Sequence, residues 1–239
     1  MTSVGAGYTA DFIYASLPPG AKRVLEIGCG NGEVSALLVE RGLSVVAIDS
    51  DPDAVAAARA RAVDARHSRW PDFPETGFDA VLFTRSLHHV AGLGESVDAA
   101  FERLAEGGRV IVEDFAYDEA PEPTLRWFRG LARIVARCGA LPAESAAAGL
   151  IGTPEPLQAW WRGEHDHDLH GPAAIDAALR ASATHVRSGN AAYYFRYLGG
   201  RTGEEPPMLD AILAHEIELG EQGVIQPLGR RWVAGREPL

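Results

Sequence analysis

The stretch VLEIGCGNGEVSALLVERGLSVVAID, Val24 to Asp49, decides the fold of this chain. A short apolar run leads into three alternating glycines, Gly28, Gly30 and Gly32, and a predicted helix then leads into a second apolar run. That second run ends on Asp49, where a carboxylate can accept hydrogen bonds from both hydroxyls of a ribose. Strand, glycine turn, helix, strand and acid form the layout of a nucleotide-binding βαβ unit, in which glycines let a ligand approach the backbone.

The spacing of the glycines in this turn, and the residue that follows them, indicate which nucleotide binds. A dinucleotide fingerprint is G-x-G-x-x-G with the pyrophosphate at the helix start, whereas here the glycines alternate and Glu33 follows them. A glutamate at that position would repel a pyrophosphate. The string E-x-G-C-G-x-G resembles motif I of the class I S-adenosylmethionine (SAM) methyltransferases, in the residues Glu26, Gly28, Cys29, Gly30 and Gly32. The resemblance implies SAM as the cofactor and S-adenosylhomocysteine (SAH) as the product.

The rest of the first half repeats the strand–helix rhythm. Further strands are predicted at 63–67, 78–84 and 109–114, with helices at 51–61 and 96–105. Asp51 followed by Pro52 is typical of a helix start. Five such repeats indicate an α/β fold with a doubly wound parallel sheet. The resemblance implies a Rossmann-like, seven-stranded, mostly parallel sheet of strand order 3-2-1-4-5-7-6, with the last strand antiparallel.

Two long segments interrupt this rhythm. We expect one class I methyltransferase domain over 1–239, with helical insertions at about 117–171 and 190–226. The segment 117–171 is too long for a simple connecting loop in a compact domain. In the family that the chain resembles, insertions after the fifth strand build a substrate lid. Tyrosines, tryptophans and phenylalanines in both segments fit either a packed core or an aromatic substrate chamber.

The resemblance carries over to a set of cofactor-binding residues. Many members of the family hold the adenine amino group with an acid after the third strand, but this chain has Ser68-Arg69-Trp70 there. Ser68 is expected to substitute as a weaker contact, and Trp70 fits either the adenine face or the core. The predicted cofactor-binding residues are Glu26, Gly28, Cys29, Gly30, Gly32, Asp49, Ser50, Ser68, Arg69, Trp70, Thr84 and Arg85.

Histidines supply the candidate catalytic residues. The segment L-H-H-V, containing His88 and His89, resembles the family segment that lies beside the transferable methyl group. Histidine suits general-base work near neutral pH, although such a pair also serves as a cap or packing group. His165 and His167 belong to an H-D-H-D-L-H run, which we interpret as a polar loop near the substrate rather than as a metal site, so no metal is predicted.

Two carboxylates end the predicted fifth strand. Glu113 and Asp114 could orient a substrate amine or hydroxyl. The alternative is a solvated strand end or a salt bridge.

Composition limits the partners. The chain of 239 residues carries 22 Lys+Arg against 33 Asp+Glu, a net charge of −11, which argues against a nucleic-acid partner. Arginines at helical spacing from Arg126 to Arg137 fit a solvated helix face. No apolar run is long enough to span a membrane, and the two cysteines suggest a reducing cytoplasm. We expect a monomer or a homodimer.

These observations favour a SAM-dependent methyltransferase that acts on a small molecule, with a specialised metabolite methylated on oxygen or nitrogen by in-line displacement. Two other classes remain open. One is a SAM-binding protein of the same fold that catalyses a reaction other than methylation. The other is an NAD-dependent oxidoreductase, which the glycine spacing disfavours.

Overall fold

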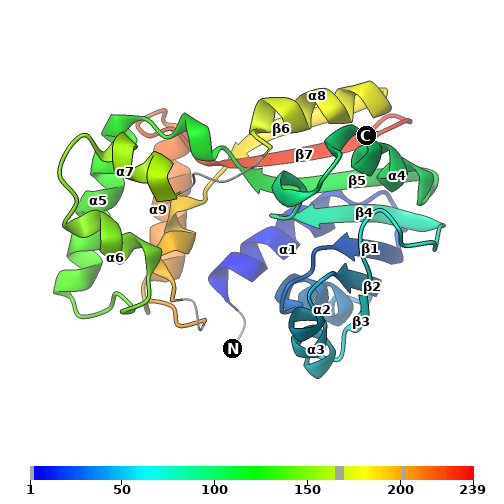
Figure 1. Ribbon diagram of the computed structural model, residues 1–239, viewed down its shortest axis with the longest axis horizontal. Coiled ribbons are helices and arrows are strands. Elements are labelled where there is room, and N and C mark those ends of the chain that lie inside the picture. Colours follow the sequence, from blue (N-terminus) through cyan, green and yellow to red (C-terminus); the bar gives the residue numbers. More distant parts are fainter. Residues whose placement is uncertain (1–2, 165–169, 201–202) are drawn as a thin grey trace. The chain divides into compact units, whose positions relative to one another are not determined.

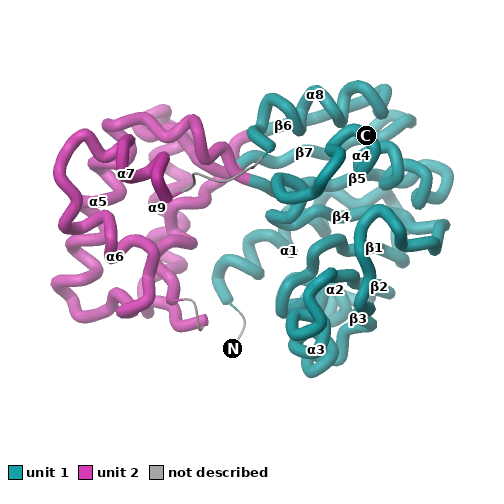
Figure 2. The backbone as a smooth tube through the Cα atoms, viewed as in Figure 1, with its two compact units in different colours: residues 1–114, 169–189, 230–239 teal, residues 115–168, 190–229 magenta. Residues whose placement is uncertain are grey.

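The computed structural model describes residues 3–164, 170–200 and 203–239. The chain divides into two compact units, coloured separately in Figure 2. The first unit comprises Met1–Asp114, Leu169–Gly189 and Arg230–Leu239, and the second unit comprises Phe115–Asp168 and Asn190–Gly229. The second unit therefore corresponds, within a few residues, to the two segments predicted as insertions.

A seven-stranded sheet forms the core of the first unit (Figure 1). Its order is β3-β2-β1-β4-β5-β7-β6, with parallel pairing from β3 to β5 and an antiparallel β7, which confirms the predicted topology. The strands are β1 (Arg23–Ile27), β2 (Ser44–Asp49), β3 (Asp64–His67), β4 (Phe78–Thr84), β5 (Leu104–Phe115), β6 (His185–Ala191) and β7 (Gly229–Gly235).

Alternating side chains of the central strands feed two separate hydrophobic clusters. Leu25 and Ile27 of β1 belong to one cluster, whereas their neighbour Val24 belongs to the other. This follows from the two-residue period of a strand, and burial on both faces explains why these strands appear as apolar runs in the sequence.

Helices cover both faces of the sheet. The cluster of Leu25 includes residues of α4 (Leu93–Glu102) and α8 (Pro172–Ser182), and the cluster of Val24 includes residues of α1 (Val4–Ser16) and α2 (Glu33–Glu40). Helix α3 (Pro52–Ala60) begins as predicted, because the Asp51 side chain accepts a hydrogen bond from the backbone N–H of Asp53. A short 3₁₀ helix, η1 (Leu87–His89), follows β4.

One predicted boundary was wrong. We expected a helix as far as residue 105 and a strand from residue 109, but α4 ends at Glu102 and β5 already begins at Leu104. Leu104 pairs with Phe78, and the register then shifts so that Arg109 pairs with Ala80. The helix-favouring residues around 104 are thus held extended by a strand far away in the sequence.

The second unit is helical. Its elements are α5 (Glu122–Arg137), α6 (Ala146–Ile151), α7 (Leu157–Glu164), α9 (Leu209–Glu221) and the short 3₁₀ helices η2 (Tyr117–Glu119) and η3 (Tyr194–Leu198). Aromatic side chains fill its interior: Tyr194 is fully buried and lies 5.2 Å from Phe128 and 5.9 Å from Trp161, measured between ring centroids. The core interpretation of these aromatics is therefore confirmed.

One buried carboxylate of the second unit has its hydrogen-bond partners within that unit. The buried carboxylate of Glu216 accepts hydrogen bonds from the backbone N–H groups of Tyr193, Tyr194 and Phe195, at 2.6, 2.9 and 2.8 Å. Burial raises the pKa of Glu216 despite these bonds.

Three arginines of α5 have polar partners close by in the same unit. Arg126 and Arg129 both form ion pairs with Glu155, and Arg133 donates a hydrogen bond to the carbonyl of Ile151. The guanidinium groups of these three arginines thus contact neighbouring residues of the same unit.

None of the helices in the described ranges has the length and apolar character needed to cross a membrane.

Candidate functional site

A cavity of about 580 Å³ lies in the first unit, at the carboxyl ends of β1, β2 and β4. This is where ligands bind in open α/β sheets. Eight of the predicted cofactor-binding residues line the cavity, and so does His89. The lining consists of Ile27, Gly28, Gly30, Ile48, Asp49, Ser50, Ser68, Arg69, Trp70, Arg85, Ser86, His89, Val90 and Ala91.

The three glycines of the motif have three different tasks. A Cβ on Gly30 would meet nothing within 4 Å, so the cavity reaches the bare backbone there. A Cβ on Gly28 would lie 2.6 Å from the Cβ of Ser86, so Gly28 admits the turn after β4. Gly32, expected at the cofactor, instead packs against α3, where an added Cβ would lie 2.6 Å from that of Ala58. All three have positive φ angles, which favour glycine.

Asp49 is held in place at the end of β2. One carboxylate oxygen accepts a hydrogen bond from the N–H of Gly30 at 2.9 Å, and the other accepts from the N–H of Asp51, also at 2.9 Å. Each carboxylate oxygen retains a second lone pair. The side chain therefore links the glycine turn to the start of α3 and can still accept bonds from hydroxyl groups in the cavity.

The wall after β3 combines serine, arginine and tryptophan. Trp70 lines the cavity, and it also packs on the core, with its ring 6.2 Å from that of Phe83 and its indole N–H donating to the carbonyl of Ser96 at 3.2 Å. The core interpretation of Trp70 thus describes part of its environment, and its contact with the adenine stays a prediction. Ser68 is tied to β2 through its N–H, which donates to the carbonyl of Asp49.

The two histidines of the turn after β4 lie in different environments. His89 is exposed and lines the cavity. His88 is buried, with its Nδ1 atom 2.6 Å from Oδ1 of Asp114 and its backbone N–H bonded to Oδ2 of the same carboxylate. The backbone N–H of His170 donates to the carbonyl of His88 at 2.9 Å. His88 therefore anchors the turn, and does not line the cavity as a catalytic group would.

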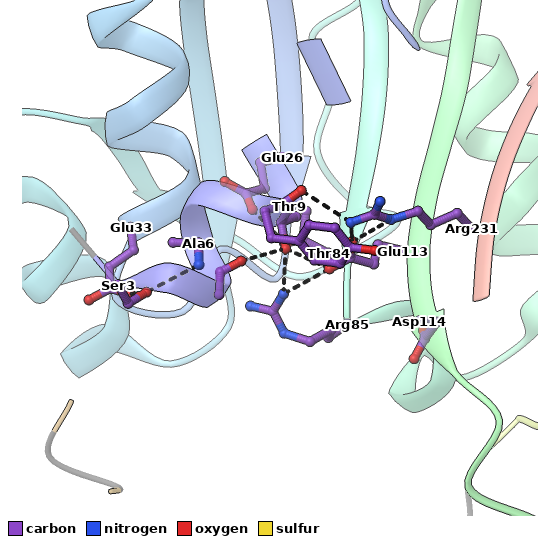
Figure 3. A network of polar contacts seen from close by, with 12 residues as sticks. Ser3, Ala6, Thr9, Glu26, Glu33, Thr84, Arg85, Glu113, Asp114 and Arg231 are labelled. Carbon is purple, nitrogen blue, oxygen red and sulfur yellow. Dashed lines mark hydrogen bonds and ion pairs between the residues drawn. The ribbon is translucent and has the colours of Figure 1, made fainter. Parts of the chain in front are cut away.

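Both carboxylates at the end of β5 are buried, and Figure 3 shows Glu113 between two arginines. Glu113 pairs with Arg85 and Arg231, and Asp114 pairs with His88. The salt-bridge interpretation is confirmed for Glu113, Asp114 is hydrogen-bonded to His88, and the interpretation of a solvated strand end is wrong for both. Thr9 of α1 also donates a hydrogen bond to Glu113.

Three other predicted cofactor residues lie beside the cavity without lining it. Glu26 is buried and accepts hydrogen bonds from the hydroxyls of Ser35 and Thr84, and burial raises the pKa of its carboxyl. Thr84 points to the same buried carboxylate. Cys29 packs against α3, and burial raises the pKa of its thiol to about 12. Their contacts therefore hold the glycine turn in place from its buried side.

Some expectations fall outside the described residues, and some lining residues were not predicted. His165 and His167 lie in the undescribed segment 165–169. Within the described ranges, no group of three or more His, Cys, Asp or Glu residues is arranged to hold a metal ion. Five lining residues were not predicted, although each is close in sequence to a predicted one: Ile27, Ile48, Ser86, Val90 and Ala91.

Sequence comparison gives the family. A family model described as a methyltransferase domain matches residues 8–146. A ubiquinone biosynthesis O-methyltransferase of Xylella fastidiosa is 34% identical over 111 residues, which cover 43% of this chain and 45% of that protein. An uncharacterized methyltransferase of Mycobacterium tuberculosis is 33% identical over 136 residues, 55% of this chain and 54% of that protein. The matched regions thus span about half the length of these relatives.

Solved structures agree on the fold. The geranyl diphosphate C-methyltransferase of Streptomyces coelicolor A3(2), in complex with SAH, has a TM-score of 0.59 at 14% identity, covering 97% of this chain and 79% of that one. The plantazolicin methyltransferase, also in complex with SAH, has a TM-score of 0.56 at 12% identity, with 97% and 82% covered. The family assignment confirms the predicted cofactor, SAM. The chain belongs to the methyltransferase-domain family of class I fold.

Proposed function

We propose that this protein transfers a methyl group from SAM to a small-molecule acceptor. The observation that carries the proposal is the cavity where the open backbone of Gly30 lies beside the fixed carboxylate of Asp49. A bare glycine backbone and a hydroxyl-accepting carboxylate together suit a nucleoside with an attached amino acid. SAM supplies a methyl group that is already activated by the positive sulfonium.

The chain's own residues would bind and orient this cofactor. Asp49 would accept hydrogen bonds from the two ribose hydroxyls, as a charged acceptor on the wall of the cavity. Ser50, Ser68 and the ring of Trp70 would surround the adenine. Gly28 and Gly30 would admit the amino acid part close to the backbone. Methyl transfer needs mainly alignment and the exclusion of water, which a preformed cavity supports.

His89 is our candidate for the group that faces the acceptor. Its exposed side chain lines the cavity from the turn after β4. For a hydroxyl acceptor, its imidazole would take the proton as the new bond forms. An amine that arrives neutral needs only placement, so oxygen and nitrogen acceptors make different demands on this residue. His165 and His167 stay proposed as secondary candidates.

The acceptor is proposed to be a specialised metabolite, with the segments 117–171 and 190–226 as its lid. Support comes from their length and from their helical character. Limited proteolysis of the full chain with and without SAH tests the lid. We expect these segments to be protected from cleavage when SAH is present, and cleavage that does not respond to SAH would count against a lid.

The cellular setting completes the proposal. The only two cysteines of the chain, Cys29 and Cys138, are free. Free thiols suit a reducing compartment, so we propose a cytoplasmic enzyme.

Calorimetric titration with SAH and with NAD⁺ tests the function first, followed by incubation with SAM and candidate acceptors. We expect SAH to bind, NAD⁺ not to bind, and SAH to accumulate together with a methylated product. Binding of NAD⁺ in place of SAH would favour an oxidoreductase. SAH binding without methylation of any acceptor in a broad panel would favour the same fold used for another reaction.

A further inference from the structure

The turn 86–91, between β4 and α4, forms part of the cavity wall and carries His89. A half-buried histidine from a distant part of the chain, His170, bonds to the carbonyl groups on either side of His89. Its backbone N–H donates to the carbonyl of His88 at 2.9 Å, and its Nε2 atom lies 2.9 Å from the carbonyl oxygen of Val90. His170 thus holds the backbone directly before and directly after the residue that we propose as the base.

The second of these bonds depends on the imidazole of His170. A carbonyl oxygen only accepts, so the Nε2 atom must carry the hydrogen. The neutral ring with its hydrogen on Nε2 and the charged ring both meet this demand. Any residue except proline could donate the backbone bond to His88, whereas the bond to Val90 needs a side-chain donor. The side chain of His170 therefore has a separable effect on the turn.

Other contacts anchor the first half of the turn to the sheet. The hydroxyl of Ser86 donates to the carbonyl of Ile27 in β1 at 2.6 Å. The carboxylate of Asp114 in β5 contacts both the backbone N–H and the Nδ1 atom of His88. The imidazole of His170 extends this anchoring to Val90, past the position of His89.

The orientation of His89 depends on the backbone that these contacts hold. Its ring lies 4.0 Å from the ring of the buried His88, measured between centroids, so one side of His89 is packed against a fixed neighbour. The peptide groups at 88–90 set the direction in which its side chain leaves the turn. A displacement of about 1 Å in a reacting group can lower a rate about 100-fold, even when the change that causes it lies away from the chemistry.

We propose that His170 is a positioning residue, whose imidazole holds the carbonyl of Val90 and thereby keeps His89 directed into the cavity. This inference rests on the proposed function and on the part of His89 in it. His170 does not itself line the cavity, so it acts through the backbone of the turn. It also gives a role to the last histidine of the H-D-H-D-L-H run.

A double-mutant cycle on turnover tests this coupling. Methylation of a hydroxyl acceptor at saturating SAM is measured for the wild type, His170→Leu, His89→Ala and the variant with both substitutions. Leucine keeps much of the volume of the ring and removes the donor. His170→Leu alone should lower kcat about 10- to 100-fold, with SAH affinity within about threefold of the wild type. In the His89→Ala background it should lower kcat by less than about threefold, because the base that it positions is already absent.

His170→Gln is the conservative variant, because a side-chain amide can donate an N–H to the carbonyl of Val90 in place of Nε2. It should keep kcat within about threefold of the wild type. His185→Ala, which removes an exposed histidine of β6, is the control and should leave kcat unchanged. Thermal melting of each variant checks the fold, and His170→Ala replaces His170→Leu in the cycle if the leucine variant does not fold.

The possible failures are distinguishable. A loss of kcat that was equally large in both backgrounds would overturn the positioning role, because His170 would then act on the fold and not through His89. A glutamine variant as slow as the leucine variant, or His89→Ala without effect on kcat, would overturn it too. A wild type that methylated no acceptor in a broad panel would overturn the proposed function, and this inference with it.

Discussion

The cavity of the first unit and the interior of the second unit are built from different kinds of residue. The cavity joins glycine backbone to charged side chains, Asp49, Arg69 and Arg85, at the ends of strands. The second unit packs aromatic rings such as those of Tyr194 and Phe128 on one another, with the buried Glu216 as a local backbone partner. The charged side chains and the bare glycine backbone of the first unit leave a cavity that a ligand can fill. The aromatic rings of the second unit pack on one another and fill its interior.

The contrast shows which sequence signals point to a site. Aromatic density suggested a substrate chamber, yet Tyr194, Phe195 and Trp161 are buried in a packed interior. Alternating glycines followed by an acid suggested a binding turn, and a cavity lies there. If this division is correct, substitutions of residues that line the cavity of the first unit should change binding or turnover, and substitutions in the packed interior of the second unit should change stability.

Replacing Gly30 should have the largest effect. In Gly30→Val the new side chain would project into the cavity, and SAH binding should be lost in calorimetric titration. The positive φ angle adds a strain of roughly 1–2 kcal/mol. Gly20→Val is the control, because Gly20 also has a positive φ and open space around its Cβ position but does not line the cavity. Unchanged affinity in Gly30→Val would break the assignment of the site.

His89→Ala should lower turnover of a hydroxyl acceptor by about 10²- to 10⁴-fold, the usual contribution of general-base assistance, with SAH affinity nearly unchanged. Steady-state kinetics and calorimetry measure the two quantities. His185→Ala, which removes an exposed histidine of β6, should leave both unchanged. A fall of less than about threefold would mean catalysis by proximity alone, and would favour an amine or carbon acceptor.

Asp49→Ala should weaken SAH binding by at least about tenfold, because charged hydrogen bonds contribute about 1.5–3 kcal/mol each and about 1.4 kcal/mol corresponds to a factor of ten. Asp51→Ala separates this effect from damage to α3. It removes the cap on the N–H of Asp53, at a cost of about 1 kcal/mol in stability, without touching the cavity. A change below twofold in Asp49→Ala would count against the ribose contact.

Glu216→Gln should act on stability alone. It weakens the set of three backbone hydrogen bonds, and we expect a loss of about 1–3 kcal/mol in the free energy of unfolding, with SAH affinity within twofold of the wild type. Glu218→Gln, at an exposed position of the same helix, is the control. Weaker SAH binding in Glu216→Gln would contradict the separation of roles between the units.

The same variant has a pH signature. Burial raises the folded-state pKa of Glu216 above its ordinary value of 4.5, so its contribution to stability is full below that value and is lost as the pH rises through the raised pKa. Glutamine does not titrate. The difference in melting temperature between the wild type and Glu216→Gln should therefore be larger near pH 5 than near pH 8.

The sequence predicts the sheet well because its central strands are buried on both faces and appear as unbroken apolar runs. The strand Phe78–Thr84 has the predicted bounds. The start of β5 was mispredicted because Leu104 is held by pairing with Phe78, a partner that local propensity does not reveal.

The site was predicted as a set of residues that are neighbours in sequence. Only those of them that face the cavity line it. Glu26 and Gly28 are two residues apart, yet the first accepts a hydrogen bond from Ser35 of α2 and the second lines the cavity. His88 and His89 are adjacent, and only the second reaches the cavity. The ion pairs of Glu113 could not be predicted, because Arg85, directly after β4, and Arg231 of β7 are distant from it in sequence.

The most direct test of the central claim is a crystal structure of the full chain with SAH. We predict that the ribose hydroxyls lie within hydrogen-bond distance of the Asp49 carboxylate and that the amino acid part lies against the backbone of Gly30. SAH bound at another place on the chain, or a ribose out of reach of Asp49, would contradict the account.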